Sequence, residues 1–154
     1  MAYRLRRRSR CIDPCDDQYP VADHLLRIVS QAAAVAALSG PQDLLHERAA
    51  ILHLQRDLFA GILNGCAGLS CGPPEGTFYL LVSCASVIGK RSTDGRKIHT
   101  DRGFAAYLLE HADVAVFPGE DFGLSPYIRV SFANSQSTLE EAGRRLKRAC
   151  EALR

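Results

Sequence analysis

The spacing of hydrophobic residues changes along the chain and predicts three regions of different character. Residues 1–29 show no clean periodicity and contain two prolines and several aspartates, so an irregular arm is expected there. An alanine-rich run then predicts a helix over residues 31–38, with Ser30 as its N-cap. The Ser-Gly-Pro sequence at residues 39–41 ends this helix, and Pro41 suits the first turn of the next one.

A long apolar stripe predicts a second helix from about Pro41 to Leu63. Asp43 and Glu47 near its start favour the helix dipole, and the Asn-Gly pair at residues 64–65 is a plausible stop. The stripe contains Leu45, Ala49, Leu52, Phe59 and Leu63, with Leu44, Ile51, Leu58 and Ile62 beside it. So long a stripe requires a surface to pack on.

After Gly72 the pattern predicts strand, helix, strand, strand and helix. The expected strands are rich in β-branched and aromatic residues and cover residues 77–84, 114–117 and 127–133. A polar loop over residues 87–100 joins the first strand to a helix that Asp101 can cap and that holds Phe104, Leu108 and Leu109.

The last helix is expected to open with a capping box formed by Ser137 and Glu140. Its inward positions are Leu139, Ala142, Leu146, Ala149 and Leu153. The sequence therefore predicts an α+β fold with a small antiparallel or mixed sheet of about three strands, covered by helices and preceded by a long helix. Residues 30–154 are expected to form one domain after the arm over residues 1–29.

Composition agrees with a folded chain of one domain. Its 154 residues are 47% apolar and 23% charged, enough to build a core. The net charge of +2 is too small to argue for a polyanionic partner, and no apolar run approaches the roughly 20 residues of a membrane span. We expect a cytoplasmic protein with neither a membrane nor a nucleic acid as partner.

Five arginines crowd the first ten residues, at Arg4, Arg6, Arg7, Arg8 and Arg10. They suit a solvated chain end, a phosphate contact or a transit-like segment, although the aspartates that follow argue against the last. Nucleic-acid binding is poorly supported, because Tyr3 is the only aromatic residue nearby that could stack on a base.

The six cysteines do not indicate a metal site. Cys11 with Cys15 and Cys66 with Cys71 are spaced more widely than in a zinc knuckle, and no histidine pair accompanies them. Cys84 and Cys150 are expected to be small buried residues, and no disulfides are expected without secretion.

Arg129 is the first candidate for chemistry. It lies in the middle of a predicted strand, and strand alternation places Ile128, Val130 and Phe132 on the opposite face. Two interpretations stay open from the residues alone: an arginine on the wet face of a sheet, or a guanidinium fork aimed at a carboxylate. The loop over residues 118–126 contains two glycines, and it has two interpretations as well: it lines a site, or it is a plain turn.

Three linked motifs carry a resemblance to a known family. Pro74-Glu75-Gly76-Thr77-Phe78-Tyr79, then VAVFPGEDFG at residues 114–123, then IRVSFA at residues 128–133 occur in order. They are similar to motifs in the C-terminal small domain of aminotransferases of the aspartate group, which use pyridoxal phosphate. The segment SQAAAVAALSGPQD, residues 30–43, extends the resemblance upstream.

The resemblance implies roles for particular residues. Arg129 falls on the family's arginine that holds the α-carboxylate of the substrate, and Phe122 and Gly123 would lie near the mouth of the site. Arg4 would contact the cofactor phosphate, since Tyr3-Arg4-Leu5 faintly resembles a phosphate-binding segment. The implied reaction moves an amino group between an amino acid and a 2-oxo acid.

One departure from the family concerns the lysine that forms the Schiff base. The lysines present are Lys90, Lys97 and Lys147, and none matches it, so no catalytic residue is expected in this chain. By the resemblance, that lysine and the large cofactor domain would precede Met1. We therefore expect a truncated aminotransferase that is inactive by itself. The alternative is a non-catalytic interaction module that pairs with itself or with a full-length relative.

Overall fold

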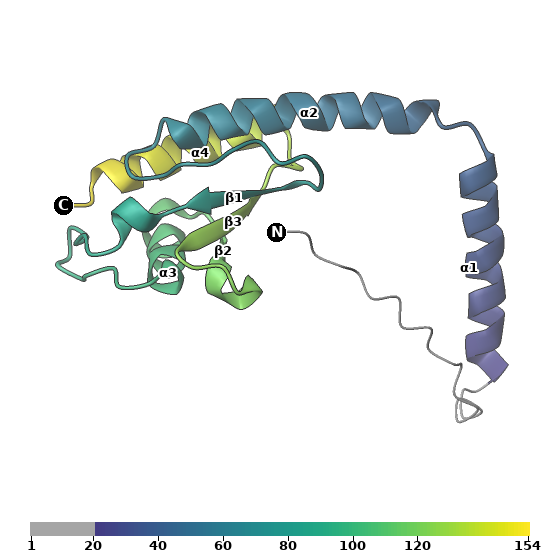
Figure 1. The fold of residues 1–154 in the computed structure, drawn as a ribbon, viewed down its shortest axis with the longest axis horizontal. Coiled ribbons are helices and arrows are strands. Elements are labelled where there is room, and N and C mark those ends of the chain that lie inside the picture. Colours follow the sequence, from purple (N-terminus) through teal and green to yellow (C-terminus); the bar gives the residue numbers. More distant parts are fainter. Residues whose placement is uncertain (1–20) are drawn as a thin grey trace, which may run out of the picture. The chain divides into compact units, whose positions relative to one another are not determined.

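The structure is a computed structural model in which residues 21–154 are described, with side-chain positions from residue 28 onward (Figure 1). It divides into two units, one ending at Leu44 and the other running from Leu45 to Arg154. The domain predicted over residues 30–154 includes parts of both units, and its boundary stays a prediction. The roles predicted for Arg4 and the other N-terminal arginines lie outside the described residues.

Helix α1 is longer than the sequence pattern predicted. It spans Val21–Ser39, so residues 21–29 are helical and the prediction of an irregular arm was wrong for them. Ser30 is an interior helical residue and not a cap. The predicted end is confirmed: the Gly40 N–H donates to the Ala36 carbonyl at 3.0 Å. The described apolar side chains of α1 are exposed.

Helix α2 spans Asp43–Asn64, close to the prediction. Its buried residues, Phe59, Ala60 and Leu63, lie in its last turns, and Leu52 upstream packs against the core while partly buried. Its end is fixed by Asn64, whose side-chain oxygen accepts from the Cys71 N–H at 2.8 Å. The exposed large apolar side chains of α2 are those of Leu44, Leu45, Ile51 and Leu54.

The sheet has three strands, as predicted, but the second covers only Phe117–Pro118, so residues 114–116 of the strand predicted over residues 114–117 lie outside it. The strands are β1 (Tyr79–Ser83), β2 (Phe117–Pro118) and β3 (Tyr127–Ser131), and both pairings in the order β1-β3-β2 are antiparallel. Arg129 on the central strand pairs with Leu81 on one side and with Phe117 on the other.

Two helix caps differ from the predicted ones. Thr100 caps α3 (Asp101–Ala112) by accepting from the Gly103 N–H at 3.1 Å, so Asp101 is the first helical residue. Ser135 caps α4 (Gln136–Glu151) by accepting from the Thr138 N–H at 3.2 Å, which replaces the predicted box of Ser137 and Glu140. The Glu140 carboxylate instead accepts from the Gln136 side chain at 2.8 Å.

The core lies against one face of the sheet. Strand residues Leu80, Val82, Ile128 and Val130 are at most 6% exposed and pack with α3, α4 and the end of α2. Cys84 and Cys150 are buried there, as predicted, and both thiols are free. The opposite face, with Tyr79, Leu81 and Arg129, is only partly covered. None of the helices in the described part combines the length and apolarity needed to cross a bilayer.

Candidate functional site

The site is centred on Arg129, on the face of the sheet opposite the core. The alternation predicted for this strand is confirmed, because Ile128, Val130 and Phe132 are 0%, 6% and 2% exposed. The backbone of β3 is held by strands on both sides, so the Cα of Arg129 has a fixed position. Its side chain therefore rises from the middle of the sheet.

Three aromatic rings surround the guanidinium of Arg129. Its Cζ lies 4.0 Å from the ring centre of Phe122, 4.4 Å from that of Tyr79 and 5.0 Å from that of Phe117. These distances are those of cation–π contacts, which attract the cation and leave its planar edge accessible. We call Tyr79, Phe117 and Phe122 the aromatic cage.

The Nε atom of Arg129 is buried and has no hydrogen-bond partner among the described residues. Buried polar groups in folded proteins are nearly always paired, so an unpaired one requires an explanation. Nε–H and one Nη–H of a guanidinium point the same way and match the two oxygens of a carboxylate. The Arg129 Nε–H is therefore a donor without an acceptor among the described residues.

Arg129 lines a pocket of about 600 Å³. Its walls come from the turn before β1, from β1 itself and from the loop before β3. The lining residues are Gly72, Pro74, Glu75, Gly76, Thr77, Tyr79, Leu81, Phe122, Leu124 and Arg129. Arg129 is the only cationic residue among them, and Glu75 the only acidic one. The pocket thus offers one anion contact within largely apolar walls.

The loop that carries Phe122 requires glycine at two positions, Gly119 and Gly123. It forms a short 3₁₀ helix, η3, over Gly119–Phe122. Gly123 ends η3 with φ 73°, in the left-handed region. A β-carbon on Gly119 would lie 2.9 Å from the Cβ of Tyr127 and closer still to backbone oxygens. Gly123 does not line the pocket but shapes the turn beside Phe122.

Two residues that sequence reasoning did not assign to the site hold this loop. The carboxylate of Asp101 accepts from the Glu120 N–H at 3.0 Å, and the guanidinium of Arg102 forms ion pairs with Glu120 and Asp121. Asp101 was predicted as a helix cap instead. For Arg102 the available signal was charge complementarity with Glu120 and Asp121. For Asp101, whose partner is a backbone N–H, charge gave no signal.

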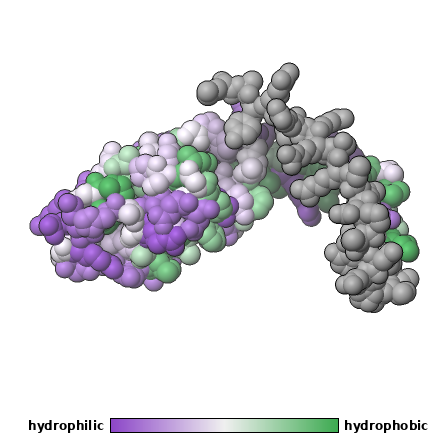
Figure 2. Space-filling view, turned by 60° about the horizontal axis from the view of Figure 1, so that its bottom comes forward, coloured by the Kyte–Doolittle hydropathy of each residue, from purple (hydrophilic) through white to green (hydrophobic). Residues whose placement is uncertain are grey.

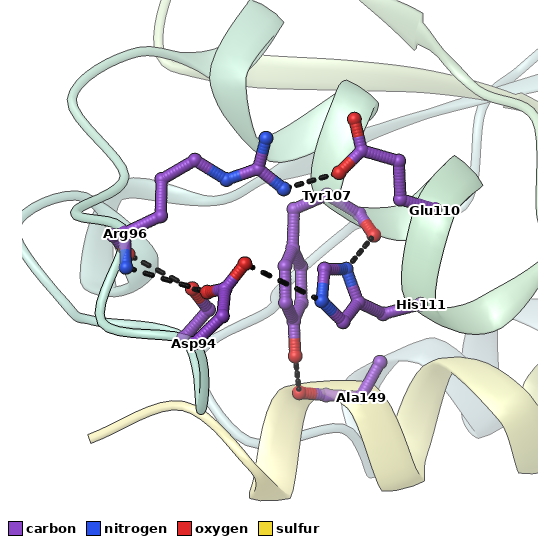
Figure 3. A network of polar contacts seen from close by, with 7 residues as sticks. Asp94, Arg96, Tyr107, Glu110, His111 and Ala149 are labelled. Atoms are coloured by element: carbon purple, nitrogen blue, oxygen red, sulfur yellow. Dashed lines mark hydrogen bonds and ion pairs between the residues drawn. The ribbon is translucent and has the colours of Figure 1, made fainter.

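A second cavity, of about 450 Å³, lies beside α3 and α4 and includes Tyr107, His111 and Arg145 in its lining. Figure 3 shows the polar network next to it, in which Arg96 joins Asp94 and Glu110. A hydrogen bond from the Ser92 hydroxyl lowers the pKa of Asp94, and one from Arg96 lowers the pKa of Glu110. Arg145 is already paired with Glu141 at 2.7 Å, so this cavity presents charges that are internally balanced.

No lysine lines the pocket of Arg129. Lys90 and Lys97 belong to the segment between β1 and α3, and Lys147 is exposed on α4. Within the described residues there is also no group of three or more His, Cys, Asp or Glu side chains arranged to hold a metal ion. Arg129 is thus the one cation among the described residues that line this pocket.

Comparisons with known proteins agree with this arrangement. Residues 19–146 match the family "Aminotransferase class I and II". An aspartate aminotransferase of Rhizobium meliloti (strain 1021) is 52% identical over 125 residues, and a probable aspartate/prephenate aminotransferase of Rhizobium leguminosarum bv. phaseoli is 46% identical over 124 residues. These matches cover 81% and 80% of this chain but only 30% and 31% of the relatives.

Solved structures give the same result. The crystal structure of the aspartate aminotransferase from Rhizobium meliloti matches with a TM-score of 0.79 and 51% identity, covering 82% of this chain and 32% of that one. An alanine aminotransferase from Pyrococcus furiosus matches with a TM-score of 0.70 and 30% identity, covering 84% and 33%. This chain spans about a third of the length of the proteins that it resembles.

Proposed function

Because the chain belongs to the class I and II aminotransferases, we propose that it supplies the substrate-carboxylate-binding small domain of such an enzyme. The parent reaction transfers an amino group between an amino acid and a 2-oxo acid. The observation that carries the proposal is the buried, unpaired Nε of Arg129, whose side chain lines an apolar pocket and lies within the aromatic cage. A carboxylate common to all amino acids and 2-oxo acids fits that atom.

In this role the residues of the chain bind and orient the substrate. The guanidinium of Arg129 gives two parallel hydrogen bonds to the α-carboxylate, which fix both the distance and the plane of that group. The aromatic cage and the side chains of Leu81 and Leu124 give the site apolar walls. These walls are partly exposed in this chain, so a domain that packs over them would exclude water from the hydrogen bonds and strengthen them. Orientation of this kind lowers the entropic part of the activation barrier.

The family's cofactor is pyridoxal phosphate, and the described residues at this pocket do not fit covalent attachment of it. Attachment requires a lysine amine, and none lines the pocket. We propose that this chain does not transaminate by itself and requires a cofactor domain supplied by other residues.

The test joins this chain to the cofactor domain of the Rhizobium meliloti aspartate aminotransferase. Arg129→Ala is expected to lower kcat/KM by about 2–5 kcal/mol of transition-state stabilisation for every amino acid tested, since all share the α-carboxylate. Arg129→Lys is expected to recover little, because an ammonium cannot form the bidentate pair. The control is Arg96→Ala, which breaks the exposed pair with Glu110 away from the pocket.

Unchanged kcat/KM in the Arg129→Ala chimera would refute the assignment. A second measurement addresses the chain alone, incubated with pyridoxal phosphate and then reduced with borohydride. No single lysine is expected to carry the reduced cofactor. A stoichiometric adduct at Lys90, Lys97 or Lys147 would contradict the proposal that the chain lacks its own catalytic amine.

Exposed apolar side chains favour a second candidate function, that of an interaction module. Leu44, Leu45, Ile51 and Leu54 on α2 are 53%, 60%, 54% and 73% exposed. Figure 2 shows one face of the molecule, where hydrophobic patches border broad hydrophilic areas. Exposed apolar surface promotes association. Sedimentation of the chain and of a Leu45→Glu, Leu54→Glu variant tests this, since a self-associating chain becomes monomeric when charges enter the contact.

A further inference from the structure

We infer that Asp101 and Arg102 are positioning residues for the Arg129 site, because they hold η3 in the place where Phe122 contacts the guanidinium. The inference rests on the proposed function, in which Arg129 binds a carboxylate. Neither residue contacts the pocket. They act through the loop, and we call the two residues together the loop clamp.

Asp101 is a buried carboxylate whose two oxygens are both used. It is 0% exposed. One oxygen accepts from the Arg102 N–H at 3.0 Å, within its own helix, and the other accepts from the Glu120 N–H at 3.0 Å, across the gap to η3. A buried carboxylate is stable only when such bonds satisfy it, so its position and that of the Glu120 backbone depend on each other.

Arg102 adds a second link between the same two segments. Its Nε pairs with Glu120 and its Nη2 with Asp121, so one guanidinium engages two consecutive residues of η3. The Arg102 side chain is 60% exposed, and an exposed pair by itself contributes little. Two pairs from one planar group nevertheless constrain how η3 is rotated about its axis.

The loop is stiff enough to pass this constraint on to Phe122. The Gly123 N–H donates to the Glu120 carbonyl at 3.1 Å, and the Leu124 N–H donates to the Gly119 carbonyl at 3.0 Å. Gly119 packs so closely against Tyr127 that no side chain would fit between them. Phe122 follows the clamped residues directly, and its ring centre is 4.0 Å from the Cζ of Arg129.

The clamp therefore keeps the carboxylate site formed before the ligand arrives. If η3 loosens, Phe122 leaves the guanidinium and Arg129 samples other rotamers. Only the fraction of molecules with the cage closed then binds well, so the apparent affinity falls by that fraction. A preformed site avoids the ordering cost at the moment of binding.

The experiment uses the full 154-residue chain, labelled with ¹⁵N and observed through the Nε–H signals of its arginines. The Arg129 signal is identified by its loss in Arg129→Lys. In the wild type we expect it to be shifted by the ring currents of the cage, and to move further on titration with acetate and with pyruvate. These two readouts report the closed cage and carboxylate binding separately.

Asp101→Asn keeps the size of the side chain but places an N–H₂ donor against a backbone donor. We expect the chemical shift of the Arg129 Nε–H to move toward the value of an exposed arginine. The Kd for acetate should rise about tenfold, because loss of the charge-assisted hydrogen bond between Asp101 and the Glu120 N–H lowers the fraction of molecules with the cage closed by about that factor. Arg102→Ala should act in the same direction with a smaller effect. The matched control is Glu110→Gln, which breaks an exposed ion pair elsewhere on α3 and should change neither readout.

Wild-type values of both readouts in Asp101→Asn and in Arg102→Ala would overturn the inference. If Asp101→Asn fails to fold, Arg102→Ala and the double variant Glu120→Gln, Asp121→Asn decide the matter, because those three side chains are exposed. If acetate and pyruvate do not move the wild-type Arg129 signal, the proposed function fails. The ring-current comparison still decides whether the clamp closes the cage.

Discussion

The hydroxyl of Tyr107 on α3 donates a hydrogen bond to the carbonyl oxygen of Ala149 on α4, at 2.9 Å (Figure 3). Tyr107 is 2% exposed, and Ala149 lies in the last turn of its helix, where carbonyls have no backbone donor within the helix. This bond therefore satisfies a carbonyl inside the core and ties together the two helices that cover the sheet.

Replacing Tyr107 by phenylalanine should lower the free energy of unfolding by about 1–3 kcal/mol, since it leaves a buried carbonyl without its donor. Urea denaturation followed by circular dichroism measures the change. Tyr127→Phe is the matched control, because no hydrogen bond of its hydroxyl is found among the described residues; it should stay within about 0.5 kcal/mol of wild type. A Tyr107→Phe variant as stable as the control would contradict the role of the bond.

Gly143 on α4 lies where Ile62 of α2 leaves no space for a side chain, because a β-carbon there would overlap the Cγ2 of Ile62. Gly143→Ala should destabilise the protein by about 1–3 kcal/mol through overpacking, despite the better helix propensity of alanine. In an Ile62→Ala background the same change should cost nothing. The melting temperatures of the two pairs give the comparison.

Gly61 provides the control for this prediction. Gly61 lies in helix α2, directly before Ile62, and a β-carbon on Gly61 would meet no atom within 4 Å. Gly61→Ala should therefore stabilise the chain by about 0.5–1 kcal/mol. Equal effects of alanine at Gly61 and Gly143 would show that helix propensity, and not contact with Ile62, decides the outcome.

The cap of α4 gives a prediction that separates two neighbouring serines. Ser135→Ala should cost roughly 1 kcal/mol, because the Thr138 N–H loses its acceptor. Ser137→Ala should cost less than half as much, since the Ser137 hydroxyl meets only the hydroxyl of Ser135, at 3.0 Å. Guanidinium denaturation of both variants tests the order, and a larger loss at Ser137 would restore the cap expected from sequence.

Buried thiols make stability fall in alkaline solution. Burial raises the pKa of Cys150 to about 12 and that of Cys84 to about 11, above the ordinary value of 9.0. Above pH 9 the unfolded chain releases these protons while the folded chain keeps them, so the free energy of unfolding decreases as pH rises toward 11–12. Below pH 9 these two thiols add no pH dependence.

Between pH 8 and pH 10 the expected loss is roughly 1 kcal/mol for each thiol. Urea midpoints at the two pH values measure it. The Cys84→Ala, Cys150→Ala variant should show a smaller loss over the same interval, because the groups responsible are gone. An identical decrease in that variant would assign the effect to other groups, such as Tyr107, whose pKa is also raised by burial.

The sequence alone determined the fold class, the three strands and the face on which Arg129 lies. These features depend on alternation and on motif order, which are local to a strand or helix. The helix ends were less certain. Thr100 with Asp101, and Ser135 with Ser137, offer similar capping groups within two residues, and only the observed hydrogen bonds decide between them.

What surrounds Arg129 was decided by the tertiary structure. Tyr79, Phe117 and Phe122 come from three separate segments, and only antiparallel pairing and the turn at η3 bring their rings around one guanidinium. Asp101 is similar: its sequence position predicts a cap, while its buried carboxylate binds the Glu120 N–H across the fold. Spacing along the chain specifies which face a side chain occupies, but its partners depend on residues far away in sequence, whose approach is fixed by packing of the whole core.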